Sequence, residues 1–296
     1  MQGETEFKIF SAQHDVYPLI DPKPHFATQT YKDKVVVITG GSTGIGAATA
    51  LFYAKAGARV VLNARRSENL EERKKVIERE VPGAQLLLVA GDIVDPDVGK
   101  RIVKLAVEKW SRLDIVIANS AAAMGGTGKL ADRDPLIWWR TQEVNVLGTL
   151  NIVHPAIPEL LKSKGQIIVT TSNASHIRVP PMADYSISKH TLNRFVEILA
   201  LDYPELPVYA VHPGEIWTSA ATEFLDSMGM KDLAEMPDTV ELPAATFLWL
   251  TARNAEFLSG RYVQASWDLN EVLAKKEEIV RDNLLVTKLA GPARSA

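Results

Sequence analysis

The amino-acid sequence predicts an α/β fold, a doubly wound parallel sheet of seven strands with helices on both faces, in a single domain. Seven short runs rich in β-branched residues alternate with longer segments of helical period. The runs are apolar without interruption, as strands covered on both faces require. The chain has 296 residues, of which 46% are hydrophobic and 23% charged, which is enough to bury one large core.

Each element follows from its local pattern. The strands are expected at residues 34–39, 59–63, 85–90, 113–118, 166–171, 208–212 and 261–265. Residues 67–80 have helical period, and Ser67 with Glu71 after it predicts an imperfect capping box at the start of that helix.

Three segments outside this alternation have expected roles. Residues 1–30, with three prolines, are expected to be an extension that wraps the domain or frays from it. The domain itself is expected over 31–268, followed by a tail at 269–296 that continues as one charged helix. Residues 215–238 are long and irregular, which is typical of a functional lid.

The composition excludes several function classes. A formal net charge of -3 and a pI near 6.1 give no general attraction to nucleic acid or to an anionic membrane, so neither partner is expected. No apolar stretch approaches the ~18 residues that span a bilayer, and no signal-peptide pattern is present. The absence of cysteine excludes disulfides and thiolate metal sites and permits a reducing compartment. We therefore expect a soluble, cytoplasmic protein.

No metal site is predicted. The histidines are not paired at metal-ligand spacing, and a structural or surface role is expected for His154, His176, His190 and His212.

A glycine cluster follows the first predicted strand. Gly40, Gly44 and Gly46 stand in the pattern T-G-x-x-x-G-x-G, and the sequence then continues as a helix that ends at Gly57. Glycines let the backbone approach a pyrophosphate, and the helix N-terminus offers unpaired N–H groups. A tight turn is the alternative for the glycines alone, but the strands on either side favour a Rossmann-type dinucleotide site.

Two arginines follow the second predicted strand, at the place where an acid would bind the 2′-hydroxyl of NAD. Arg65 and Arg66 instead suit a 2′-phosphate, which predicts NADP(H) in preference to NAD(H). The alternative is that both side chains are merely solvated.

A third constellation surrounds Tyr185. Lys189 is four residues later on one helical face, and Ser172 precedes the tyrosine by thirteen residues, just past the fifth strand. Together with "TGGSTGIG", "GD" at 91–92, "ANSA" at 118–121, "VNVLG" at 144–148, "YSISK" and "HPG" at 212–214, these residues resemble the short-chain dehydrogenase/reductase family. The resemblance covers roughly residues 32–265, and the tail beyond is similar in style to that of fungal members.

The resemblance implies a reaction. Tyr185 would donate a proton to a carbonyl oxygen, Lys189 would favour the phenolate and hold the nicotinamide ribose, and Ser172 would bind the substrate oxygen. Asn145 matches the position that retains a water for proton relay. The cofactor supplies the hydride. The remaining implied cofactor contacts are Gly40, Ser42, Thr43, Gly44, Ile45, Gly46, Arg65, Arg66, Asp92, Ile93, Asn119, Ser120, Pro213, Gly214, Ile216 and Thr218.

The predicted function is therefore an NADPH-dependent reductase, or in reverse a dehydrogenase, of a ketone, aldehyde or secondary alcohol. Six residues of the expected lid suggest an apolar substrate, such as a polycyclic or aromatic one: Trp217, Phe224, Leu225, Met228, Met230 and Met236. The family resemblance also implies a homodimer or homotetramer, although the two termini could alter that assembly.

Two alternatives remain. Ser120 and Ala121 replace the usual Ala-Gly after the fourth strand and place a side chain near the cofactor path, so a non-catalytic NADPH-binding regulatory protein is one. A non-redox or cyclising biosynthetic enzyme on the same scaffold is the other.

Overall fold

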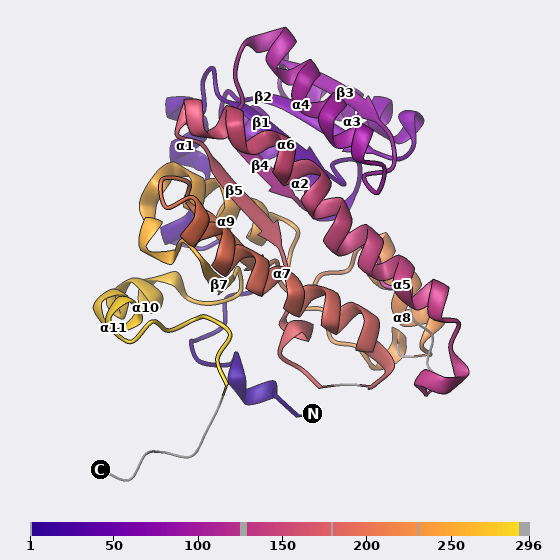
Figure 1. Ribbon diagram of the computed structural model, residues 1–296. Helices are drawn as coiled ribbons and strands as arrows, with labels where there is room; N and C mark the ends of the chain where they lie inside the picture. The colour runs from indigo at the N-terminus through magenta and orange to yellow at the C-terminus, as the bar shows by residue number, and fades with distance from the viewer. Residues whose placement is uncertain (1, 125–128, 179, 230, 290–296) are drawn as a thin grey trace.

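The computed structural model describes residues 2–124, 129–178, 180–229 and 231–289. One parallel sheet has the strand order β3-β2-β1-β4-β5-β6-β7 (Figure 1). Its strands are β1 (Val35–Thr39), β2 (Arg59–Ala64), β3 (Leu86–Ala90), β4 (Ile115–Ala118), β5 (Gln166–Thr170), β6 (Val208–His212) and β7 (Arg261–Gln264). All seven predicted strands are present, which confirms the predicted fold class.

Helices lie between the strands, before β1 and after β7. They are α1 (Lys23–Thr28), α2 (Gly44–Lys55), α3 (Ser67–Glu80), α4 (Pro96–Trp110), α5 (Pro135–Gln142), α6 (Gly148–Ser163), α7 (Ala183–Asp202), α8 (Ser219–Ser227), α9 (Glu241–Trp249), α10 (Leu269–Ala274) and α11 (Lys276–Arg281). A π-helical segment, Glu143–Leu147, joins α5 to α6.

The two faces of the sheet are buried by different helices. Val36 and Ile38 of β1 contribute to the core that includes buried residues of α2, α3 and α9. Val35 and Val37 contribute to a second core, shared with α4, α6 and α7. Because successive strand side chains point to opposite faces, a continuously apolar strand such as β1 supplies both cores.

The side on which the chain adds strands to the sheet changes after β3, and the switch point lies between β1 and β4. The chain runs outward from β1 through β2 to β3, and then returns to place β4 on the other side of β1. Ligands of such sheets bind at the carboxyl ends of the strands near this switch point.

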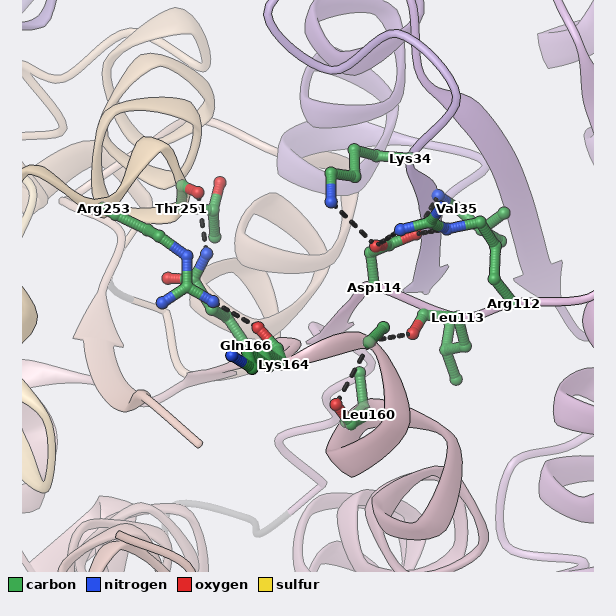
Figure 2. A network of polar contacts seen from close by, with 11 residues as sticks. Lys34, Val35, Arg112, Leu113, Asp114, Leu160, Lys164, Gln166, Thr251 and Arg253 are labelled. Atoms are coloured by element: carbon green, nitrogen blue, oxygen red, sulfur yellow. Dashed lines mark hydrogen bonds and ion pairs between the residues drawn. The ribbon is translucent and has the colours of Figure 1, made fainter. Parts of the chain in front are cut away.

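The amino ends of the strands are held by a polar network (Figure 2). The Asp114 carboxylate accepts hydrogen bonds from Lys34 Nζ at 3.2 Å, from the Val35 N–H at 2.9 Å and from Arg112 at 2.8 and 2.6 Å. Burial alone would raise the pKa of Asp114, but the Arg112, Val35 and Lys34 contacts outweigh it and lower the pKa. This end of the sheet is therefore fixed by structural contacts.

Three expectations need correction. Ser67 does not cap α3; the helix begins at Ser67, Arg66 is its N-cap residue without a side-chain cap bond, and the Ser67 hydroxyl donates to Glu68. The residues after β7 do not form one helix but the short α10 and α11. Residues 215–238 are not wholly irregular, because they contain α8.

The last helix of the tail, α11, ends at Arg281 because of the backbone conformation that follows it. Asn283 and Leu285 have φ values of 48° and 61°, a left-handed conformation that no helix continues through. The Leu285 carbonyl then accepts a hydrogen bond of 2.8 Å from the Tyr262 N–H. The tail thereby binds the outer edge of β7, which would otherwise be an open strand edge.

The first residues of the chain pack along the segment that follows β7. Ala12 and Trp267 form an antiparallel bridge, and the Trp267 indole donates to the Phe7 carbonyl at 2.9 Å. Phe7 and Ile20 are buried in the core. The described part of the extension therefore wraps the domain.

Candidate active site

The glycine loop lies at the carboxyl end of β1 and requires glycine at specific positions. Gly40 and Gly44 have φ values of 65° and 52°, which favour glycine. A side chain on Gly46 would place its Cβ 2.3 Å from the Gly40 carbonyl oxygen. The loop backbone is therefore packed as closely as a site that cradles a phosphate requires.

The N-terminus of α2 opens at this loop. Thr43 is its N-cap residue, and the threonine side chain makes no cap hydrogen bond. The first N–H groups of a helix have no intrahelical partner, and the helix dipole adds partial positive charge there. The predicted contacts Gly44, Ile45 and Gly46 form this first turn, so these residues fit a pyrophosphate.

Backbone contacts bring the ends of β1, β2 and β3 together. The Gly41 N–H donates to the Asn63 carbonyl at 3.0 Å, and the Asn63 side chain donates to the Gly91 carbonyl at 3.1 Å. Arg65 and Arg66 leave β2 directly after this point and are exposed. Neither has a hydrogen bond or ion pair to any residue that the structure describes, so both guanidinium groups are open to an anion.

The predicted cofactor contacts Asp92 and Ile93 are placed differently from each other. Asp92 is ion-paired, because its Oδ2 accepts from Arg140 at 2.7 Å while Arg140 also pairs with Glu143 at 2.9 Å. Ile93 is buried in the core, where its side chain lies against Gly148. The structure therefore brings Asp92 to the sheet edge but turns the Ile93 side chain inward.

Asn119 and Ser120 support the glycine loop from β4. The Asn119 amide donates to the carbonyls of Thr39 and Gly40 at 3.2 and 3.4 Å. The Asn119 and Ser120 N–H groups both donate to the Thr39 hydroxyl, at 3.0 and 3.1 Å. The side chain of Asn119 thus holds the end of β1 in register with the end of β4.

Ser172, Tyr185 and Lys189 converge from β5 and α7. Lys189 Nζ donates to the Thr170 carbonyl at the end of β5, at 2.8 Å, and lies 5.6 Å from the centre of the Tyr185 ring. Ser172, two residues after Thr170, lies near enough to the Tyr185 hydroxyl to lower the pKa of that phenol. The three side chains predicted to react therefore form one cluster.

Burial controls the titration of this cluster. It lowers the pKa of Lys189 to about 7, because desolvation disfavours the charged ammonium. It raises the pKa of Tyr185, and the nearby Ser172 side chain only partly opposes that rise. In the protein by itself the pKa of Tyr185 thus moves opposite to the expected lowering, since desolvation exceeds any effect of Lys189.

Asn145 lies fully buried in the π-helical segment, a feature frequent at functional sites. Its side-chain amide accepts from the Ala122 N–H at 2.7 Å and donates to the Ala122 carbonyl at 2.9 Å and the Ser188 hydroxyl at 2.8 Å. The Ser188 hydroxyl in turn donates to the Tyr185 carbonyl at 2.7 Å. Asn145 therefore connects the chain after β4 to the turn of α7 that carries Tyr185.

The predicted lid begins beside the glycine loop. A Cβ added to Gly44 would lie 3.0 Å from the methyl group of Thr218, and the Thr218 hydroxyl caps α8. Phe224 of α8 places its ring centre 6.4 Å from that of Tyr185. Leu225 is buried and Trp217 is exposed, while Met230 lies outside the described residues.

The two ends of the predicted lid are tied together at Asp238. Its Oδ2 accepts from the Glu215 N–H at 2.6 Å, directly after the predicted contacts Pro213 and Gly214, and Ile216 pairs with Asp238 in a parallel bridge. His14 Nδ1 from the N-terminal extension lies 2.6 Å from Asp238 Oδ1.

The sequence does not predict the contacts of Arg73, Arg140 and His14. Arg73 and Arg140 stand within ordinary charged helical patterns, and His14 in a segment without regular structure, so nothing in the sequence shows what they contact.

The glycine loop, the open helix terminus and the reactive cluster define a dinucleotide-dependent α/β enzyme site. The model of the short chain dehydrogenase family matches residues 34–228, and the chain therefore belongs to this family of oxidoreductases, which bind a nicotinamide cofactor and act on small molecules.

Individual relatives agree with this assignment. The chain is 32% identical over 304 residues to the short chain dehydrogenase pigC of Monascus ruber, covering 97% of this chain and 96% of that one. A short chain dehydrogenase of Shigella flexneri, solved in complex with NADP, is 25% identical with a TM-score of 0.72 over 80% of this chain and 99% of its own. Levodione reductase, 21% identical, has the same fold with a TM-score of 0.75 over 80% of this chain and 97% of its own.

None of the described helices is long and apolar enough to cross a bilayer. Within the described ranges, no three histidine, aspartate or glutamate side chains gather as a metal site would require.

Proposed function

We propose that the protein is an NADPH-dependent reductase of ketones or aldehydes, acting in reverse as a dehydrogenase of secondary alcohols. The observation that carries this proposal is the convergence of Ser172, Tyr185 and Lys189 at the carboxyl edge of the sheet. A protein that only bound the nucleotide would need the glycine loop but not this cluster.

The chain's own residues suit proton transfer to a carbonyl oxygen. Ser172 lies close enough to Tyr185 to lower the pKa of the phenol, so a substrate oxygen between the two hydroxyls would accept a hydrogen bond from each. Tyr185 donates the proton as negative charge develops on that oxygen. Lys189, lying behind the ring, stabilises the phenolate when its ammonium is charged. Bound NADPH supplies the hydride.

Asn145 is a positioning residue in this scheme. Its contacts with Ala122 and Ser188 fix the turn of α7 that presents Tyr185. The proton relay through a water beside Asn145, which the family resemblance implies, remains part of the proposal.

NADP is the proposed cofactor because Arg65 and Arg66 are exposed at the end of β2 and form no hydrogen bond or ion pair with the residues that the structure describes. A 2′-phosphate would give these guanidinium groups charge-assisted hydrogen bonds. The NADP complex of the Shigella flexneri relative supports the same choice.

The proposed substrate is apolar. Phe224 approaches Tyr185, and the segment of the predicted lid also contains the apolar residues Trp217, Leu225 and Met228. A marked preference for small charged substrates would contradict this part of the proposal.

We also propose that the protein is a homodimer or homotetramer and that it is cytoplasmic. Large apolar side chains are exposed along α5, α6 and α7, where a partner would cover them: Leu136, Trp139, Leu150, Ile187 and Leu201. Light scattering on a size-exclusion column would test the assembly, and a monomer at micromolar concentration would refute it.

The test of the reaction is NADPH oxidation with a panel of ketones and aldehydes. Tyr185→Phe should reduce the rate on accepted substrates by ~10²–10⁴-fold, the usual contribution of a positioned acid. The phenyl ring keeps the packing against Phe224, so the local structure of the site should remain. Rates within about threefold of wild type would refute the role of Tyr185.

A further inference from the structure

The side chain of Arg73 reaches the glycine loop from α3. Its Nε donates a hydrogen bond of 3.2 Å to the Ser42 carbonyl. The two terminal nitrogens of the guanidinium, Nη1 and Nη2, have no hydrogen-bond or ion-pair partner among the residues that the structure describes. The residue is half-buried rather than free in solvent.

A cation that is partly removed from water is stabilised by a nearby anion, which offsets the cost of desolvation. Burial lowers the pKa of Arg73, and no carboxylate opposes that effect. Arg112 and Arg140 differ, since hydrogen bonds with Asp114 and Glu143 raise their pKa values. An arginine remains charged at neutral pH, so the guanidinium of Arg73 is a cation with no anionic partner among the described residues.

The position of Arg73 indicates which anion of the cofactor would pair with the guanidinium. Ser42 lies in the glycine loop, and the neighbouring Gly41 is bonded to Asn63 of β2. Arg65 and Arg66 follow β2 directly, so Arg73 approaches the loop from the helix that follows these two arginines. The pyrophosphate is expected instead at the N-terminus of α2.

We propose that Arg73 binds the 2′-phosphate of NADP together with Arg65 and Arg66, and is a determinant of the preference for NADPH over NADH. This role rests on the proposed NADP dependence. Because NADH lacks the 2′-phosphate, the contribution of Arg73 is confined to NADPH. A residue that only supported the loop would affect both nucleotides alike.

The test is a titration of the full-length protein with NADPH and with NADH, followed by quenching of tryptophan fluorescence. Arg73→Met should weaken NADPH binding ~10–100-fold, as expected for the loss of hydrogen bonds to a charged group, and leave NADH binding within about twofold. Arg73→Lys keeps the positive charge but loses the planar, bidentate hydrogen-bond donors of the guanidinium. This variant should retain part of the NADPH affinity.

Lys74→Met is the matched control. Lys74 is adjacent on α3, and its ammonium lies 3.9 Å from Glu78, so the variant removes the same charge without reaching the loop. It should change the affinity for neither nucleotide by more than about twofold.

Three outcomes would overturn the role of Arg73. Equal losses of NADPH and NADH affinity in Arg73→Met would show a residue that only holds the loop. If Arg73→Met still preferred NADPH to NADH, the role of Arg73 would be refuted, but the proposed NADPH-dependent function would not. Wild-type protein that binds both nucleotides equally would refute the NADP preference and the role of Arg73 with it.

Discussion

Replacing Lys189 with methionine should abolish a rise in stability that the wild-type protein shows between pH 7 and 9. Burial lowers the pKa of Lys189 from 10.5 to about 7 in the folded protein. In the unfolded chain the ammonium keeps its proton up to about pH 10.5. Above pH 7 the unfolded state therefore binds more protons, so stability rises with pH, and this contribution is lost as the pH falls through 7.

The magnitude follows from the two pKa values. Integrating the difference in bound protons from pH 7 to 9 gives about 2 kcal/mol of added stability. The buried histidines His176 and His212, with pKa values lowered by burial to about 4 and about 3, complete their effect near pH 7. The buried tyrosines, such as Tyr185, have raised pKa values and contribute only at higher pH. The window from pH 7 to 9 thus isolates Lys189.

Urea unfolding of wild type and Lys189→Met at pH 7, 8 and 9 measures this difference. Methionine fills the same space without a charge, so the variant should have nearly constant stability across the window. Its NADPH-dependent activity should also fall, since the ammonium behind Tyr185 is gone. An equal rise in both proteins, or no rise in wild type, would show that the Lys189 ammonium is not desolvated in the folded protein.

Three further changes have expected results. Gly46→Ala places a Cβ 2.3 Å from the Gly40 carbonyl oxygen, so nucleotide titration should show loss of both NADPH and NADH binding, and unchanged affinity would refute the close packing of the loop. His14→Ala removes the contact with Asp238, and limited proteolysis should cleave residues 215–238 faster while the overall free energy of unfolding changes by less than about 1 kcal/mol, because His14 is itself half-exposed. Asn145→Ala should lower the free energy of unfolding in urea by at least about 2 kcal/mol, since it leaves buried hydrogen-bonding groups unpaired, and a smaller loss would show that these contacts are replaced.

The parallel sheet was predictable because its signal is local. An uninterrupted apolar run such as 35–38 permits few structures other than a strand covered on both faces, and the intervening helical periods impose parallel order. The reactive cluster was predictable for a related reason, since Tyr185 and Lys189 share a helical face and Ser172 follows a strand that packs beside that helix.

The remaining features depend on contacts between distant segments. Nothing in the sequence pairs His14 with Asp238, or Asp92 with Arg140, because each contact joins residues that the fold alone brings together. The prediction of one helix over the tail was wrong at its C-terminal end. There the left-handed conformation of Asn283 and Leu285, and the hydrogen bond from the Tyr262 N–H to the Leu285 carbonyl, override the local helical preference. The cap predicted at Ser67 failed because the helix starts one residue earlier than the cap pattern implied.

Transfer of deuterium from NADPH labelled at the nicotinamide C4 tests the proposed reaction most directly. The protein is incubated with each C4 epimer of the labelled NADPH and the panel of ketones and aldehydes, and the products are examined by mass spectrometry. The proposed function predicts an alcohol that carries one deuterium from one epimer only, and much less product with Tyr185→Phe. A product without deuterium from either epimer would establish a non-redox reaction, and the absence of product with every substrate would favour a nucleotide-binding protein without turnover.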